Sequence, residues 1–157
     1  GKLAIFEEHL YTESVQGVLR NAIASIPHPG DSPRVLLTTV PQEPHGLGVL
    51  MAEAMFALEG ARCIPLGVRT PVIEIVRGAE SQQIDVVALS FSPVVNPHQV
   101  IESLKELRAQ LPEATELWAG GSSPALQRRP QAGVRVLGRL DDVGPAVAGW
   151  RAGQLPA

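Results

Sequence analysis

The sequence predicts an α/β protein built on a five-stranded, parallel, doubly wound sheet, preceded by a helical segment. Two observations carry this prediction. Short apolar runs alternate five times with longer segments whose apolar residues recur every three or four positions. Segments that alternate in this way form a parallel sheet with helices on both faces, because the crossovers between parallel strands are right-handed.

Composition agrees with one domain of this kind. The 157 residues are 45% hydrophobic but 4% aromatic, so the core must be aliphatic. The net charge is −3 and the largest basic cluster is the pair Arg128 and Arg129, which argues against a nucleic-acid surface. The single Cys63 fits a reducing compartment, and no apolar run approaches the roughly 20 residues that span a bilayer. We therefore expect a cytoplasmic protein with no membrane partner.

The N-terminal residues 1–27 are predicted to be helical and separate from the sheet. Apolar residues such as Phe6, Leu10 and Val18 recur at helical spacing, and they are best explained as a packing face against other helices or a second subunit. Residues 28–33 follow as a linker rich in Pro, Gly, Asp and Ser. Residues 34–157 then form the α/β domain.

Each element of this domain has a local signal. The strands are short apolar runs at 34–40, 61–66, 84–91, 115–119 and 134–137. The helices are amphipathic segments at 46–60, 71–82, 97–110, 124–129 and 141–152. Gly60 ends the first of these helices, Thr70 is a candidate cap for the second, and Asn96 with Pro97 opens the third.

The loop after the first strand combines a carboxylate, a histidine and two glycines. Ligands of parallel sheets bind beyond the carboxyl ends of the strands, so this loop is a candidate site. Glu43 could accept a hydrogen bond from one ring nitrogen of His45 and leave the other nitrogen free for a metal. Gly46 and Gly48 would let a bulky group approach the backbone. The alternative is a surface turn with an incidental histidine.

Two further loops carry small or polar residues at strand ends. Ser90 and Ser92 end the most apolar strand, and their hydroxyls can bond a polar ligand or the loop carboxylate. Gly120 and Gly121 follow the fourth strand and would let a ligand lie against the backbone. The alternatives are hydroxyls that satisfy backbone groups at a strand end and an ordinary turn.

Together, these loops resemble the cobalamin-binding domain family. That family carries Asp-x-His-x-x-Gly after the first strand, Ser-x-Leu at the third and Gly-Gly after the fourth. Here Glu43 stands in place of the aspartate before His45, and Ser92 stands in place of the leucine. The resemblance covers roughly residues 33–157 and implies a Rossmann- or flavodoxin-like fold that binds cobalamin.

The resemblance also implies roles for individual residues. His45 would be the lower axial ligand of cobalt, replacing the dimethylbenzimidazole base, and Glu43 would hold its other ring nitrogen. The displaced nucleotide tail would run between the strand ends. The residues implied to lie beside that tail, or to leave space for it, are Ser90, Ser92, Val94, Gly120 and Gly121.

Three features are similar to the sensory halves of cobalamin-dependent, in part light-responsive, MerR-type transcriptional regulators: the Glu form of the first loop, the stretch Leu66–Pro71, and the pair Glu8 and His9. In that group a four-helix bundle covers the upper corrin face. Residues 1–27 would be the end of such a bundle, with Glu8 and His9 near the upper ligand. The cofactor would be adenosylcobalamin, with methylcobalamin as the alternative.

That likeness implies a sensor and not an enzyme. Ligand or light would change the oligomeric state of a homo-oligomer, and DNA would be bound by a domain outside this chain. One alternative is the corrinoid-carrying subunit of a methyltransferase, which shares the fold, the motifs and a helical cap. Another, motivated by the substitutions at Glu43 and Ser92, is a degenerate interaction module that binds no corrinoid.

Overall fold

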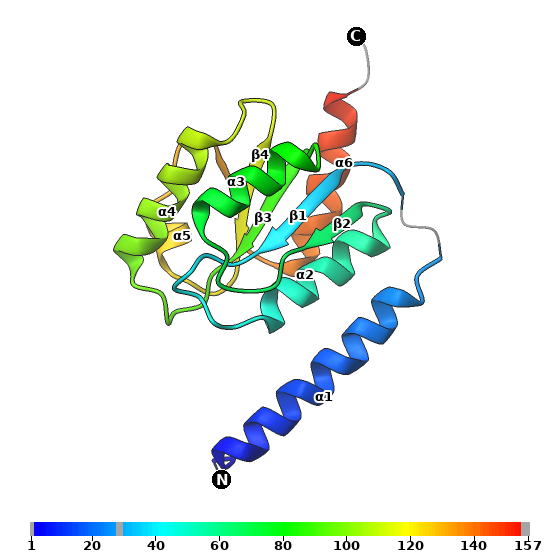
Figure 1. The fold of residues 1–157 in the computed structure, drawn as a ribbon, viewed down its shortest axis with the longest axis vertical. Helices are drawn as coiled ribbons and strands as arrows, with labels where there is room; N and C mark the ends of the chain where they lie inside the picture. The colour runs from blue at the N-terminus through cyan, green and yellow to red at the C-terminus, as the bar shows by residue number, and fades with distance from the viewer. Residues whose placement is uncertain (1, 28–29, 155–157) are drawn as a thin grey trace.

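The computed structural model describes residues 2–27 and 30–154. Residues 28–29 of the predicted linker, and the ends at 1 and 155–157, lie outside the described residues. All pairings in the sheet are parallel, in the order β2-β1-β3-β4-β5 (Figure 1). Its strands are β1 (Arg34–Thr38), β2 (Arg62–Pro65), β3 (Val86–Ser90), β4 (Glu116–Gly120) and β5 (Val134–Leu137). This order is the flavodoxin-like one, and the predicted fold class is confirmed.

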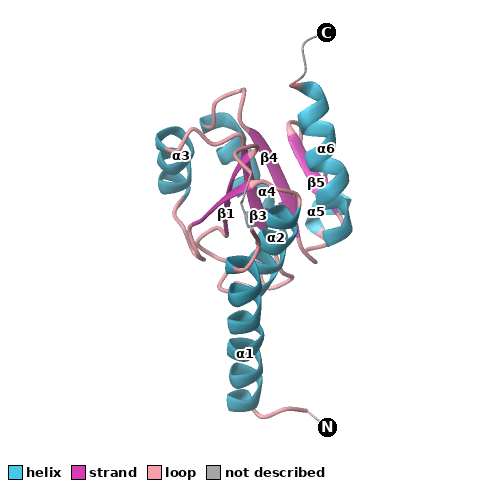
Figure 2. Ribbon diagram, turned by 90° about the vertical axis from the view of Figure 1, so that its right-hand side faces the viewer, coloured by secondary structure: helices cyan, strands magenta, loops and turns pink. Residues whose placement is uncertain are grey.

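Helices cover both faces of the sheet. They are α2 (Leu47–Leu58), α3 (Val72–Ser81), α4 (Pro97–Gln110), α5 (Ala125–Arg128) and α6 (Val143–Gly153), with a 3-10 turn η1 (Leu140–Asp142) before α6. Figure 2 shows α3 and α6 on opposite sides of the strands. Alternate residues of each strand enter two buried hydrophobic clusters, because successive side chains of a strand point to opposite faces. On β1, Leu36 packs with α3 and α4, and Leu37 packs with α2 and α6.

One predicted helix cap is wrong and another is confirmed. Pro71, and not Thr70, is the N-cap residue of α3. The Thr70 hydroxyl is 2.6 Å from the Thr38 hydroxyl and ties the β2–α3 loop to the end of β1. At α4, the Asn96 side chain accepts a hydrogen bond from the His98 backbone N–H at 2.8 Å, as its sequence position predicts.

The N-terminal helix α1 (Ile5–Ala24) is continuous and packs against α2. Figure 1 shows its N-terminal half extending away from the sheet. None of its residues is buried, and several large apolar side chains are exposed, among them Ile5, Phe6, Leu10, Tyr11 and Val18. No helix in the described part of the chain combines the length and hydropathy needed to cross a membrane.

Candidate functional site

The predicted site residues of the α/β domain gather at one edge of the sheet. Parallel strands end at the same edge, so the loops after β1, β3 and β4 lie side by side. Ser90 and Gly120 are register partners at the ends of β3 and β4. The β1–α2 loop joins them there, because Glu43 contacts Ser92 across 49 positions of sequence.

The Glu43 carboxylate is buried in this edge, with 1% of the residue exposed. One carboxylate oxygen accepts the backbone N–H of Ser92, and the other accepts the Ser92 hydroxyl at 3.0 Å. The Glu43 carbonyl accepts the Thr39 hydroxyl at 2.8 Å, and that hydroxyl accepts the Arg69 N–H at 2.9 Å. Ser92 therefore holds the carboxylate itself, and Thr39 with Arg69 holds the backbone of the loop that carries it.

His45 is the partner that this carboxylate orients. Its Nδ1 lies 3.3 Å from the Glu43 Oε2 and 3.4 Å from the Ser92 hydroxyl, while 59% of its side chain is exposed. When Nδ1–H donates to the carboxylate, Nε2 carries the free lone pair and is the atom available to a metal. The described residues contain no group of three or more His, Cys, Asp or Glu that could hold a metal ion. A site with one oriented imidazole can complete the coordination of a metal whose other ligands come from an organic macrocycle.

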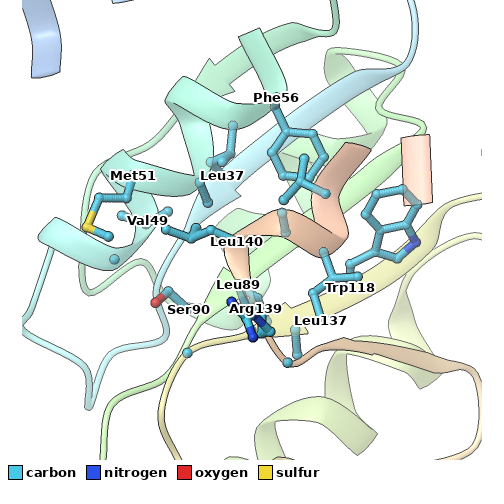
Figure 3. A pocket seen from close by; sticks show the side chains of 18 of the residues that line it. Leu37, Val49, Met51, Phe56, Leu89, Ser90, Trp118, Leu137, Arg139 and Leu140 are labelled. Carbon is cyan, nitrogen blue, oxygen red and sulfur yellow. The ribbon is translucent and has the colours of Figure 1, made fainter. Parts of the chain in front are cut away.

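A cavity of about 300 Å³ opens beside this loop, between α2, the sheet and the β5–η1 turn (Figure 3). Its inner wall is apolar and includes Leu37, Phe56 and Trp118. The two aromatic rings stack with centroids 5.9 Å apart. The predicted site residues Gly48, Ser90, Gly120 and Gly121 also line it. The cavity thus combines an apolar inner wall with small and polar groups at the strand ends.

Glycine is required at different positions of this edge for different structural reasons. A Cβ on Gly48 would lie 2.6 Å from the Ser90 Oγ, so glycine there leaves the hydroxyl in position. Gly121 has φ +107°, and a Cβ would lie 2.2 Å from the Phe91 carbonyl oxygen. The backbone of the chain itself therefore requires glycine at position 121, whatever binds in the cavity. A Cβ on Gly120 would be 3.2 Å from the Leu137 carbonyl oxygen.

Other predicted site residues lie away from the cavity. Val94 is 64% exposed on the β3–α4 loop, where its N–H donates to the Ser92 hydroxyl at 3.3 Å. Glu8 and His9 are exposed in the N-terminal half of α1. Within the described residues, no side-chain hydrogen bond joins either of them to the sheet edge.

A second cavity, of about 400 Å³, separates α1 from the sheet edge. Gln16 and Arg20 line it from α1, and Gly46, Glu53 and Val68 are among the residues opposite. Burial raises the pKa of the Glu53 carboxyl, and the Arg20 guanidinium partly opposes the rise. His9 lies seven residues before Gln16, which places both on the same side of the helix.

Sequence reasoning missed three contributors to the site. Thr39 supports the Glu43 loop, and its signal is a hydroxyl directly after a buried strand. Trp118 is 1% exposed in the core and also forms a cavity wall. Arg139 lines the same cavity, and no local pattern marks it in the sequence.

Comparisons with known proteins agree with this fold. The family described as the B12 binding domain matches residues 33–148. The HTH-type transcriptional repressor CarH of Myxococcus xanthus is 28% identical over 123 residues, which are 78% of this chain and 41% of that protein. The chain thus spans less than half the length of this curated relative.

Two solved structures share the fold at low identity. A cobalamin-binding protein from Desulfitobacterium hafniense superposes with a TM-score of 0.54 at 22% identity, over 76% of this chain and 59% of that one. The monomethylamine corrinoid protein of Methanosarcina barkeri superposes with a TM-score of 0.58 at 15% identity, over 88% of this chain and 65% of that one.

Proposed function

Because the chain belongs to the B12-binding domain family, we propose that it binds cobalamin through His45 and serves as the sensory part of a transcriptional regulator. Cobalamin binding is the activity of the family. The His45 ligand and the regulatory role are the new parts of the proposal. The observation that carries the ligand assignment is the buried Glu43 carboxylate, which contacts one ring nitrogen of an otherwise exposed imidazole.

The residues present fit a cobalamin with its tail displaced. When bound, cobalamin would supply a cobalt ion that takes a nitrogen ligand and, as adenosylcobalamin, a light-sensitive cobalt–carbon bond. His45 would supply that nitrogen, held by Glu43 and Ser92. The apolar cavity lined by Gly48 and Ser90 would receive the nucleotide tail. Its remaining proposed contacts are Gly46, Ser92, Val94, Gly120 and Gly121.

Two departures from the family pattern favour a site that binds cobalamin over a degenerate site that has lost this function. Glu43 stands for the family's aspartate and Ser92 for its leucine, and these two residues are hydrogen bonded at 3.0 Å. The Ser92 hydroxyl gives the carboxylate a partner that a leucine could not offer. A leucine at position 92 would leave the buried Glu43 Oε2 without this hydroxyl, and a buried polar group that loses its partner costs about 1–3 kcal/mol.

The N-terminal segment is assigned to a helical cap over the upper corrin face. In this assignment residues 1–27 are the end of the cap, 28–33 a linker and 34–157 the cofactor domain. Glu8 and His9 would then lie near the upper ligand, with adenosylcobalamin as the preferred form. The likeness to a protein named as an HTH-type repressor supports the regulatory role. DNA contact would belong to a separate domain.

The exposed apolar side chains of α1 support assembly into a homo-oligomer. Illumination or a change in the bound ligand would then alter the oligomeric state of the protein. This function needs no catalytic residue. The alternative function is a corrinoid carrier for a methyltransferase, which would use the same His45 loop. Size-exclusion chromatography of the adenosylcobalamin complex, before and after illumination, separates the two. A light-dependent change in size favours the sensor, and methylation of bound cob(I)alamin by a partner methyltransferase favours the carrier.

The direct test of the proposal is an absorption titration with adenosylcobalamin. Wild type should give the spectrum of histidine-ligated cobalt, and His45→Ala should lose it. His98→Ala is the matched control, since His98 is exposed at the start of α4, and it should behave as wild type. A wild-type chain that leaves the spectrum unchanged would refute the proposal.

A further inference from the structure

Among the described residues that line the apolar cavity beside the His45 loop, one is charged, Arg139. Every other described residue that lines it is aliphatic, aromatic, a glycine, a methionine or a serine. The chain as a whole is negatively charged, with a net charge of −3. A cation in this apolar wall therefore gives one point of the cavity a local preference for anionic ligands. Figure 3 shows Arg139 among the side chains around the cavity.

The backbone at Arg139 is fixed at the rim of the cavity. Arg139 lies two residues after the end of β5 and directly precedes η1, and its N–H donates to the Asp142 carboxylate at 2.9 Å. The end of β5 lies beside the end of β4, where Gly120 pairs with Leu137. The arginine therefore stands at the same sheet edge as Gly121 and Ser122, which line the cavity with it.

The Arg139 guanidinium has one side-chain partner, and that contact is exposed to solvent. Its Nη2 is 3.5 Å from the Asp141 carboxylate, but the two side chains are 78% and 79% exposed, and such surface pairs contribute little. Other arginines have structural uses. Arg108 donates to the Thr115 and Pro112 carbonyls, and Arg135 lies over the Trp118 ring at 5.3 Å.

We propose that Arg139 binds the phosphodiester of the cobalamin nucleotide tail and thereby selects corrinoids that carry this tail. The inference rests on the proposed function, in which the tail enters this cavity. The tail joins an aromatic base to a phosphate through a ribose, and the cavity offers an apolar wall with a cation at its rim in the matching order. A guanidinium suits a phosphate because it donates two parallel hydrogen bonds to it.

The test compares two ligands, cobalamin and cobinamide, which has the corrin ring without the nucleotide tail. Wild type, Arg139→Gln and Arg139→Lys are titrated with each by calorimetry or absorbance. Arg139→Gln should weaken cobalamin binding about 3- to 10-fold, a modest value for an exposed charge pair, and leave cobinamide binding unchanged. Arg139→Lys should keep part of the affinity, since it keeps the charge.

The control is Arg62→Gln, an exposed arginine at the opposite end of the sheet, which should bind both ligands as wild type does. Raising the salt concentration should weaken cobalamin binding more for wild type than for Arg139→Gln. Equal affinity of Arg139→Gln and wild type for cobalamin overturns the inference, and so does an equal loss for both ligands or an unchanged salt dependence. If wild type binds no cobalamin at all, the proposed function itself fails.

Discussion

The Glu43 carboxylate is almost fully buried, yet both of its oxygens accept hydrogen bonds from Ser92, and one also contacts His45. At the scale of single residues, this contact explains two substitutions that look unrelated in the sequence. A carboxylate with several partners keeps one geometry, and an imidazole held by it presents one nitrogen outward. The orientation of the His45 ring is thus a property of three residues, Glu43, His45 and Ser92.

Gly121 offers a test of residue-level strain. Gly121→Ala should lower the free energy of unfolding by about 1–3 kcal/mol, because alanine must adopt φ +107° and its Cβ would meet the Phe91 carbonyl. Urea denaturation measures the change. Gly149→Ala is the control: Gly149 lies inside α6 with open space around it, so its alanine variant should be stabilised by about 0.5–1 kcal/mol. If Gly121→Ala left the free energy of unfolding unchanged, the backbone at position 121 would not require glycine.

Cys63 should be an unreactive thiol. Burial raises its pKa to about 12, and the neighbouring Glu53 carboxylate adds to the rise. At pH 8 the thiolate fraction would then be about one in ten thousand, and it should grow roughly tenfold per pH unit up to pH 11. Iodoacetamide labelling of native chain should be at least about 100-fold slower than that of chain unfolded in urea.

Glu53→Gln should speed this labelling, since it removes one of the two causes of the shift. Equal labelling rates for native and unfolded chain would show that the thiol is not desolvated. Glu53→Gln with no change in rate would show that burial alone raises the pKa of Cys63.

At the scale of elements, α1 differs from every helix of the sheet domain. None of its residues is buried, and both hydrophobic clusters are built without it. Helices obtain most of their stability from packing, so α1 depends on α2 and on whatever covers its exposed apolar side chains. We therefore expect the position of α1 to change when a partner or a ligand covers these side chains.

Removal of residues 1–24 should therefore leave the sheet domain folded. We expect a loss of about 1–2 kcal/mol, which for a domain of this size lowers Tm by about 2–8 °C. Thermal unfolding followed by circular dichroism checks this. As a control, Leu104→Ala in the full chain removes a side chain that is 2% exposed, and should cost about 2–5 kcal/mol. Loss of cooperative unfolding in the shortened chain would contradict an independent sheet domain.

At the scale of the whole molecule, cofactor and fold should be coupled. A ligand that binds the folded state alone, at 100 times its Kd, adds about 2.7 kcal/mol, or about 5–11 °C in Tm for a chain of this length. We expect this shift with cobalamin in a differential scanning experiment kept in the dark. His45→Ala should shift less at the same concentration. A shift equal to that of wild type would place the main binding energy outside the His45 loop.

Residue periodicity alone determined the elements and their class. The apolar runs and amphipathic segments identified every strand of the sheet and the helices between them, because the spacing of side chains along a strand or a helix is a local property. The same reasoning brought the residues after β1, β3 and β4 to one edge, since parallel strands must end together. Periodicity did not determine the helix caps. The N-cap of α3 is Pro71, while the Thr70 hydroxyl contacts Thr38 instead.

Tertiary structure decided what depends on packing between distant segments. The order β2-β1-β3-β4-β5, the bond between Glu43 and Ser92, the contact that requires glycine at position 121, and the cavity with Arg139 at its rim all join residues far apart in sequence. No local pattern encodes such pairs, because their energy arises when the sheet brings them within bonding distance. The residue types of the candidate site are thus written in the sequence, and the geometry that could hold a cofactor is set by the fold.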